Sequence, residues 1–174
     1  MEIETHHAET HDSFGKIIGI QTALLAMVLS IFSILSHQSN TESIILVNQS
    51  SNQWSHYQAK RIRDYQLELN IKLLQLMAPS NEQTAKTITQ YSKEQNKYKS
   101  ELADIKAEAD KTVEEGKLVH RKTSYFELAE GLLEISMILS SLYFLSRKKL
   151  FPILGLLLGI SGGFIGILGL LLHP

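Results

Sequence analysis

The chain has 174 residues, a formal net charge of -1 and no cysteine. This length fits one compact unit or one small membrane protein, and the nearly balanced charge argues against nucleic-acid binding because no strongly basic surface is available. The missing cysteine excludes disulfides, cysteine-ligated zinc and thiol chemistry.

Apolar residues are concentrated at the two ends of the chain, and charged residues fill the middle. The first apolar run, Ile17 to Leu35, carries no charge and rises roughly 28 Å as a helix, close to a bilayer core of about 30 Å. The acidic, histidine-containing tail at residues 1–15 lacks the basic start and the cleavage site of a signal peptide. We therefore expect an uncleaved transmembrane helix over residues 16–36.

The segment 37–123 is predicted to form a long antiparallel helical hairpin outside the membrane, because it holds few glycines and one interior proline, Pro79. Two stripes with three- and four-residue spacing indicate two amphipathic helices in a coiled-coil-like pair. The first stripe comprises Trp54, Gln58, Ile62, Tyr65, Leu69, Leu73 and Leu76. The second stripe comprises Tyr91, Gln95, Tyr98, Leu102, Ile105, Ala109, Thr112, Gly116 and Val119.

The arms of this hairpin have predicted ends. Pro79 stops the first arm, so the turn lies near residues 78–83, and Ser80 or Asn81 can cap the next helix. The first arm is expected to continue the first membrane helix. The alternative is a local break at the polar stretch "SHQSNTES", residues 36–43.

The second membrane helix is predicted at residues 124–146 and contains three acids, Glu127, Glu130 and Glu134. Their offsets of three and four residues put them on one helical face. Glu134 lies roughly 20 Å from the basic residues that follow the helix, at about 1.5 Å per residue. A carboxylate in hydrocarbon is costly, so the acids either line an ion or proton path in an oligomer, or the helix begins outside the bilayer and Glu134 is protonated or hydrogen-bonded in a bundle.

The third membrane helix is predicted at residues 150–172 and starts with Pro152 in its first turn. Small residues on this helix let membrane helices approach closely, either within the same chain or between subunits. The expected packing residues are Gly155, Gly159, Gly162, Gly163, Gly166 and Gly169.

Arg147, Lys148 and Lys149 form the short loop between the last two helices. The positive-inside rule places this loop and the N-terminus in the cytoplasm, and the hairpin outside it, in the periplasm of a Gram-negative cell. Three basic residues within the range 117–122 oppose this orientation, because they lie on the supposed outer side.

The stretch "QWSHYQAK" in the first arm holds the only tryptophan of the chain. An aromatic pair flanked by glutamine and lysine is typical of a packing node between helices, with the polar tips hydrogen-bonded at its edge, and the alternative is a ligand or partner site. The residues of this node are Gln53, Trp54, Tyr57, Gln58, Ala59 and Lys60.

The same stretch, placed after a first membrane helix, resembles the QWxxYQAK-type motif of the bacterial membrane protein family catalogued as domain of unknown function 4337. The stretches "YSKEQNKYKSELADIKAEAD" and "FELAEGLLEISMILSSLYFLSRKK" and the glycine-rich last helix are similar too, so the resemblance covers nearly the whole chain except the tail. It assigns the node residues to the motif and Glu130 to a matching acid, whereas Glu134 departs from the pattern. It implies three membrane helices and a bacterial inner-membrane location, and it implies no activity.

Nothing in the sequence indicates catalysis, since no phosphate-binding loop, GxSxG elbow or HExxH motif is present. We interpret the histidines of the tail, His6, His7 and His11, as incidental rather than as metal ligands. We therefore expect no enzyme activity, no metal and no cofactor.

The predicted fold is an all-α membrane protein with three transmembrane helices and the extramembrane hairpin between the first and the second. We expect a membrane-anchored scaffold or interaction protein that is homo-oligomeric, contacts membrane lipid, binds no nucleic acid and offers its hairpin to an unidentified protein partner. The alternative is an oligomeric ion channel or transport component with Glu130 and Glu134 lining a membrane path.

Overall fold

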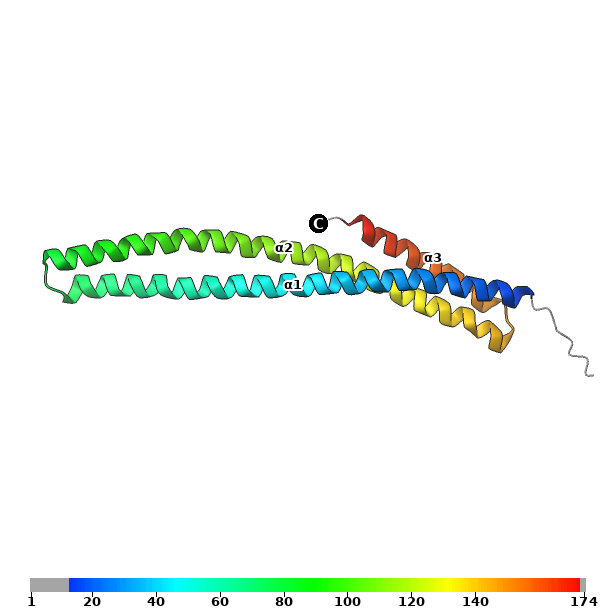
Figure 1. Ribbon diagram of the computed structural model, residues 1–174. Coiled ribbons are helices and arrows are strands. Elements are labelled where there is room, and N and C mark those ends of the chain that lie inside the picture. The colour runs from blue at the N-terminus through cyan, green and yellow to red at the C-terminus, as the bar shows by residue number, and fades with distance from the viewer. Residues whose placement is uncertain (1–12, 173–174) are drawn as a thin grey trace, which may run out of the picture. The chain divides into compact units, whose positions relative to one another are not determined.

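The computed structural model describes residues 13–172, and all regular secondary structure in this range is helical. Helix α1 spans Ser13–Met77, helix α2 spans Glu82–Ser146, and helix α3 spans Leu150–Leu171 (Figure 1). Of the tail predicted at residues 1–15, residues 1–12 lie outside the described range, and the last three residues belong to α1.

Helices α1 and α2 each run for 65 residues without an interruption. Neither contains a proline, so every turn can keep its backbone hydrogen bonds. The break considered at residues 36–43 is wrong, because this polar stretch is helical throughout. Each long helix therefore joins an apolar segment to a polar one.

The turn between α1 and α2 lies at residues 78–81, as the sequence predicts. The side-chain Oδ1 of Asn81 accepts hydrogen bonds from the backbone N–H and the hydroxyl of Thr84, at 2.8 and 3.0 Å. This geometry satisfies an N–H of the first turn of α2, which has no partner within the helix. The predicted cap is thus confirmed at Asn81.

The link between α2 and α3 consists of three residues, 147–149. Arg147 has a φ of 54°, the left-handed conformation that commonly ends a helix. Its backbone N–H still donates to the carbonyl of Tyr143 at 2.8 Å. The chain therefore leaves α2 sharply and enters α3 at once.

The described chain divides into two compact units. The three-helix unit consists of residues 13–40 and 120–172 and contains all of α3 with one end each of α1 and α2. The two-helix unit consists of residues 41–119.

The three-helix unit has a small apolar core, in which Phe32 of α1 and Phe126 of α2 stack at a ring-centroid distance of 6.3 Å. The core is completed by Leu25, Ala129 and Leu133. All three helices are long and apolar enough to cross a membrane, by length and composition. The unit thus has the helix lengths that a bilayer requires.

In the two-helix unit, α1 and α2 lie side by side (Figure 1). Lys60 of α1 forms an ion pair with Glu101 of α2, and Leu46 lies next to Gly116. Between residues 43 and 74, ten buried or half-buried positions of α1 alternate by three and four residues, which is the heptad spacing of a coiled coil, and the half-buried Trp54 and Glu68 lie beside them. We call these positions the α1 seam: Ser43, Leu46, Ser50, Gln53, Tyr57, Lys60, Asp64, Leu67, Ile71 and Leu74.

The second predicted stripe is confirmed as the packed face of α2, since all its members from Tyr91 to Val119 are buried or half-buried. The prediction that the first stripe is the packed face of α1 is wrong. Ile62, Leu69 and Leu76 are 57%, 56% and 83% exposed. The α1 seam faces α2 instead; half of its residues are polar and half are apolar or aromatic, and the apolar stripe lies on the other side of the helix.

Candidate functional site

The motif stretch 53–60 occupies two turns of α1 in the two-helix unit, and its residues divide between two sides of the helix. The seam positions Gln53, Tyr57 and Lys60 are half-buried, as is Trp54 beside them. Gln58 and Ala59 are exposed. The structure therefore brings only part of the predicted node to the contact with α2.

Lys60 makes the most direct polar contact between the two helices. Its ammonium donates to the carboxylate of Glu101, and it lies 5.6 Å from the centre of the Tyr98 ring. The side chains of Lys60 and Glu101 are only 20% and 31% exposed. The hydrogen bond from Lys60 holds the pKa of Glu101 below its ordinary value of 4.5.

Two buried oxygen atoms on the α1 seam have no hydrogen-bond partner among the described residues: Oε1 of Gln53 and Oδ1 of Asp64. Asp64 is 9% exposed and lies one helical turn after Lys60. Buried polar groups without partners cost stability. The Lys60–Glu101 pair, in contrast, favours the register in which these two charges meet.

Aromatic and basic side chains form a ladder on α1 next to the seam. The rings of Trp54 and Tyr57 meet edge to face at 5.4 Å. The Arg61 guanidinium donates to the hydroxyl of Tyr57 at 2.8 Å and to that of Tyr65 at 3.0 and 2.9 Å. The hydrogen bond to Tyr65, and to a smaller extent that to Tyr57, raises the pKa of Arg61, so the guanidinium stays charged. The two hydroxyls hold this charged group against the helix surface.

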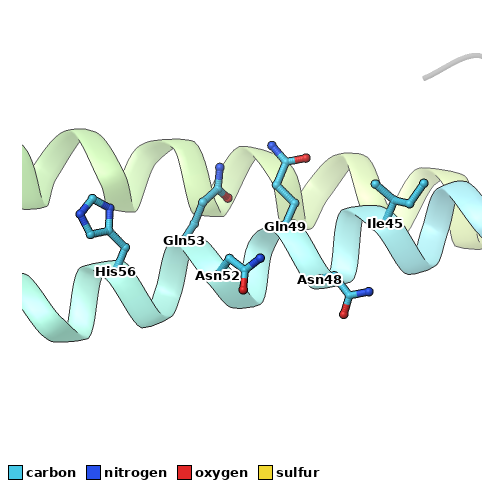
Figure 2. A pocket seen from close by; sticks show the side chains of 6 residues that line it. All are labelled: Ile45, Asn48, Gln49, Asn52, Gln53 and His56. Atoms are coloured by element: carbon cyan, nitrogen blue, oxygen red, sulfur yellow. The ribbon is translucent and has the colours of Figure 1, made fainter.

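An open groove of about 580 Å³ runs along the preceding turns of α1, and Figure 2 shows its side chains on this one helix. The lining residues are Ile45, Asn48, Gln49, Asn52, Gln53 and His56. Four amides and an imidazole can donate and accept hydrogen bonds but offer no nucleophile activated by a base. The groove thus offers amide and imidazole groups beside apolar surface for contact with another molecule.

The three acids of the second predicted membrane helix lie on the outer surface of the three-helix unit. Glu127 and Glu134 are exposed, and Glu130 is half-buried. None of the three forms an ion pair or a hydrogen bond with another residue of the range 13–172. The bundle of this chain therefore does not surround Glu134.

The interior of the three-helix unit instead contains a polar network that the sequence analysis did not anticipate. The amide of Gln21 on α1 donates to the hydroxyl of Ser140 at 3.1 Å and to the carbonyl of Pro152 at 3.2 Å. The hydroxyl of Ser136 donates to the carbonyl of Gly155 at 2.5 Å. These bonds join α1, α2 and α3, as polar residues do between membrane helices.

The glycine stripe of α3 packs against α1 and α2 of the same chain. A Cβ at Gly155 would lie 2.7 Å from the carbonyl oxygen of Ser136, and one at Gly162 would lie 3.0 Å from the Cβ of Leu132. Gly159, Gly166 and Gly169 are equally close to neighbouring side chains. Gly163 differs, because nothing lies within 4 Å of its Cβ position.

The basic link carries the predicted topology charges in exposed positions. Arg147, Lys148 and Lys149 are all exposed. The ammonium of Lys149 lies 4.9 Å from the centre of the Phe14 ring at the start of α1. One end of the three-helix unit therefore concentrates positive charge beside an aromatic residue, as is common at a membrane surface.

The described range 13–172 contains no group of three or more histidine, cysteine, aspartate or glutamate side chains that could hold a metal ion. The tail histidines lie outside the described residues.

Comparison with known proteins identifies one family. The family model described as "Domain of unknown function (DUF4337)" matches residues 14–172, nearly the whole chain. No curated protein and no solved structure matches the chain significantly. The resemblance carried by the "QWSHYQAK" stretch is thus confirmed.

Proposed function

Because this chain belongs to the DUF4337 family, for which no activity is described, we propose its function from its own geometry: a membrane-anchored helical scaffold. The observation that carries the proposal is that α1 and α2 each continue, without a break, from an apolar segment of membrane length into a polar segment. Such helices suit a protein that holds a polar rod at a bilayer surface.

The exposed side chains of the three-helix unit support insertion into a bilayer. On α1, Ile17, Ile20 and Met27 are each about 60% exposed, and on α3 Leu157 and Phe164 are equally exposed. A soluble protein rarely exposes so many large apolar groups in one region. In lipid these groups are favourable, and the interior polar network of Gln21 satisfies groups that lipid could not.

The two-helix unit would be the extramembrane hairpin of the scaffold. The seam positions at heptad spacing support a coiled-coil-like pair, and the charged outer side of α2 supports contact with water. The basic link at residues 147–149 favours a cytoplasmic loop, which puts the hairpin in the periplasm of a bacterial inner-membrane protein. We also propose that the protein is a homo-oligomer, that its hairpin binds a protein partner, and that it catalyses no reaction.

Single cysteines test the anchor and its orientation, because the chain has none of its own. Lys148→Cys reports on the basic link, and Lys93→Cys, at an exposed position of α2, reports on the two-helix unit. In intact cells a membrane-impermeant maleimide should label Lys93→Cys and not Lys148→Cys, while both react after lysis. Labelling of Lys148→Cys alone reverses the orientation, and a protein that alkaline washing removes from membranes contradicts the anchor.

A second candidate function, an oligomeric ion channel or transport component, is favoured by the outward position of Glu134. An unpaired acid at this depth needs water or a partner, and several copies could supply both around a common path. Glu134→Gln should then abolish cation flux into liposomes that contain the purified protein. A scaffold predicts no flux with either glutamate or glutamine at this position.

A further inference from the structure

We propose that two copies of the chain pair through the outer side of α1 in the two-helix unit. This outer stripe consists of Ile62, Tyr65, Leu69, Leu73 and Leu76, which are between 44% and 83% exposed. Their spacing of three and four residues keeps them on one face of the helix, away from the α1 seam. The inference deepens the proposed scaffold by naming its partner, a second copy.

The outer stripe has no counterpart on the other helix of the unit. Within residues 82–119, Leu118 is the only large apolar side chain that is strongly exposed, and the outer side of α2 carries lysine, aspartate and glutamate. A partner of the two-helix unit would therefore contact α1 and leave α2 in water. Since each chain offers one such face, the contact closes at two copies instead of growing into a ring or a filament.

The size of the apolar face fits a weak but specific helix pair. Ile44 and Val47 extend the same side of α1 toward its middle, with the half-buried Trp54 between them and the stripe. From Ile44 to Leu76 this side is about 48 Å long and about 10 Å wide, or roughly 500 Å² for each chain, with the exposed Ser51, Ser55 and Gln58 in its middle. Two such faces give about 1,000 Å², the lower limit for a biological interface.

The charges beside the stripe favour a second copy over a lipid surface. Arg61 is bound to the hydroxyls of Tyr57 and Tyr65, and Lys72 is paired with Glu68 at 2.6 Å. The hydroxyls leave Arg61 charged, whereas Glu68 offsets the charge of Lys72. A face that binds anionic lipid needs several free cations at its edges, and Lys72 is not free. The Lys72–Glu68 pair also lets identical helices lie side by side there without strong repulsion.

The proposed anchor fixes the direction of the pair. Two chains in one membrane present identical segments at the same distance from it, so the two α1 helices are parallel and in register. Identical residues then face each other across the two-fold axis, as in other isologous interfaces. The product is a four-helix arrangement in which the two α1 helices are central and the two α2 helices face water.

Cross-linking of single cysteines tests the pairing. Leu69→Cys and Leu73→Cys place thiols in the outer stripe, and Lys106→Cys is the matched control on the exposed side of α2. Mild oxidation in membranes should give disulfide dimers at position 69 or 73 at least about tenfold above the control, because a disulfide needs Cα atoms within roughly 7 Å. Equal yields at all three positions, or a higher yield at position 106, would overturn the proposal.

The mass of the protein in nanodiscs supplies the second measurement. The unmodified chain should be a dimer, and Leu69→Arg should weaken dimerisation at least about 30-fold, as expected for a residue at the centre of an interface. Ala103→Arg, at an exposed position of α2, should leave the dimer intact. A monomeric unmodified chain, a particle of more than two copies, or equal effects of the two arginines would overturn the pairing.

Failure of the anchor would be recognised separately. The membrane fraction after an alkaline wash reports on insertion and does not depend on the outer stripe. A protein that stays in the membrane as a monomer contradicts the pairing and leaves the scaffold. A protein lost from the membrane contradicts the scaffold, and cross-linking in solution still decides the pairing.

Discussion

A matched pair of alanine substitutions on α3 separates the buried side of the glycine stripe from its open side. At Gly155 a new Cβ would lie 2.6 Å from the hydroxyl of Ser140 and 2.7 Å from the backbone oxygen of Ser136. Backbone atoms within a helix yield little, so the helices must move apart. At Gly163 the same Cβ meets nothing within 4 Å.

The expected magnitudes follow from these contacts. Both substitutions gain about 1 kcal/mol of helix propensity, so this contribution cancels between them. Overpacking at Gly155 costs about 1–3 kcal/mol, and the hydrogen bond from Ser136 to the Gly155 carbonyl loses about 1 kcal/mol more. Gly155→Ala should therefore be about 2–4 kcal/mol less stable than Gly163→Ala.

Reversible unfolding in mixed micelles, titrated with a denaturing detergent and followed by circular dichroism, measures this difference. Gly159→Ala should fall between the two variants, because its closest neighbours are the side-chain ends of Leu25 and Ser136, which can move. The reasoning is refuted if Gly155→Ala and Gly163→Ala have equal stability, since α3 would then not pack through this side.

Three further predictions concern other parts of the chain. Because the pKa of Glu101 is lowered by Lys60, the stability that their pair contributes is present above pH 4.5 and lost as the pH falls through the lower folded pKa, and the melting temperature should follow this course. Lys60→Met should remove the part of this pH dependence that comes from Glu101, while the part from Glu68, whose pKa Lys72 lowers, stays. Asp64→Leu should raise the melting temperature of the two-helix unit by removing an unpaired buried oxygen, and a lower value would show that the carboxylate has a partner. Phe126→Ala should cost about 3–5 kcal/mol in detergent unfolding because the side chain is fully buried, and a loss below about 1 kcal/mol would contradict the core.

The sequence predicted well those features that depend on one segment alone. Helix ends followed from Pro79 and Asn81, and the packed face of α2 followed from apolar residues such as Leu102 and Ile105. These signals are local, because a cap or a repeat of apolar residues is visible without knowing the partner. The family resemblance rested on a local motif in the same way.

The packed face of α1 could not be found in this way. Hydrophobic periodicity tells which side of a helix is apolar, and on α1 this side is the outer stripe. On the side that meets α2, serine, glutamine, lysine and aspartate make up half of the α1 seam, so this side has a weaker apolar pattern than the outer stripe until the partner helix is known. The exposed apolar residues of α1 thus led to the wrong packed face. The same residues form the outer stripe through which we propose that two copies pair.

The membrane-segment sites show a similar division. The glycines of α3 were predicted as a packing face, but the sequence left open whether they meet the same chain or another. The network of Gln21, Ser136 and Ser140 gave almost no signal, because one glutamine within an apolar run has no spacing to recognise. Both the glycine packing and the polar network depend on contacts between segments that are far apart in the sequence. Residues 21 and 140, for example, are 119 positions apart.

The buried serines of α1 have a consequence for the proposed membrane anchor. Ser36, Ser39, Ser43 and Ser50 are each at most 8% exposed, and they follow one another through the part of the helix where apolar sequence gives way to polar sequence. Small hydroxyl side chains permit close helix contact without relying on the exclusion of water, so such contacts hold in lipid headgroups as well as in solution. In the proposed scaffold these serines would therefore keep the contact of α1 with its neighbouring helices on both sides of the bilayer edge, while the exposed His37, Gln38 and Glu42 mark that edge on the outer side of α1.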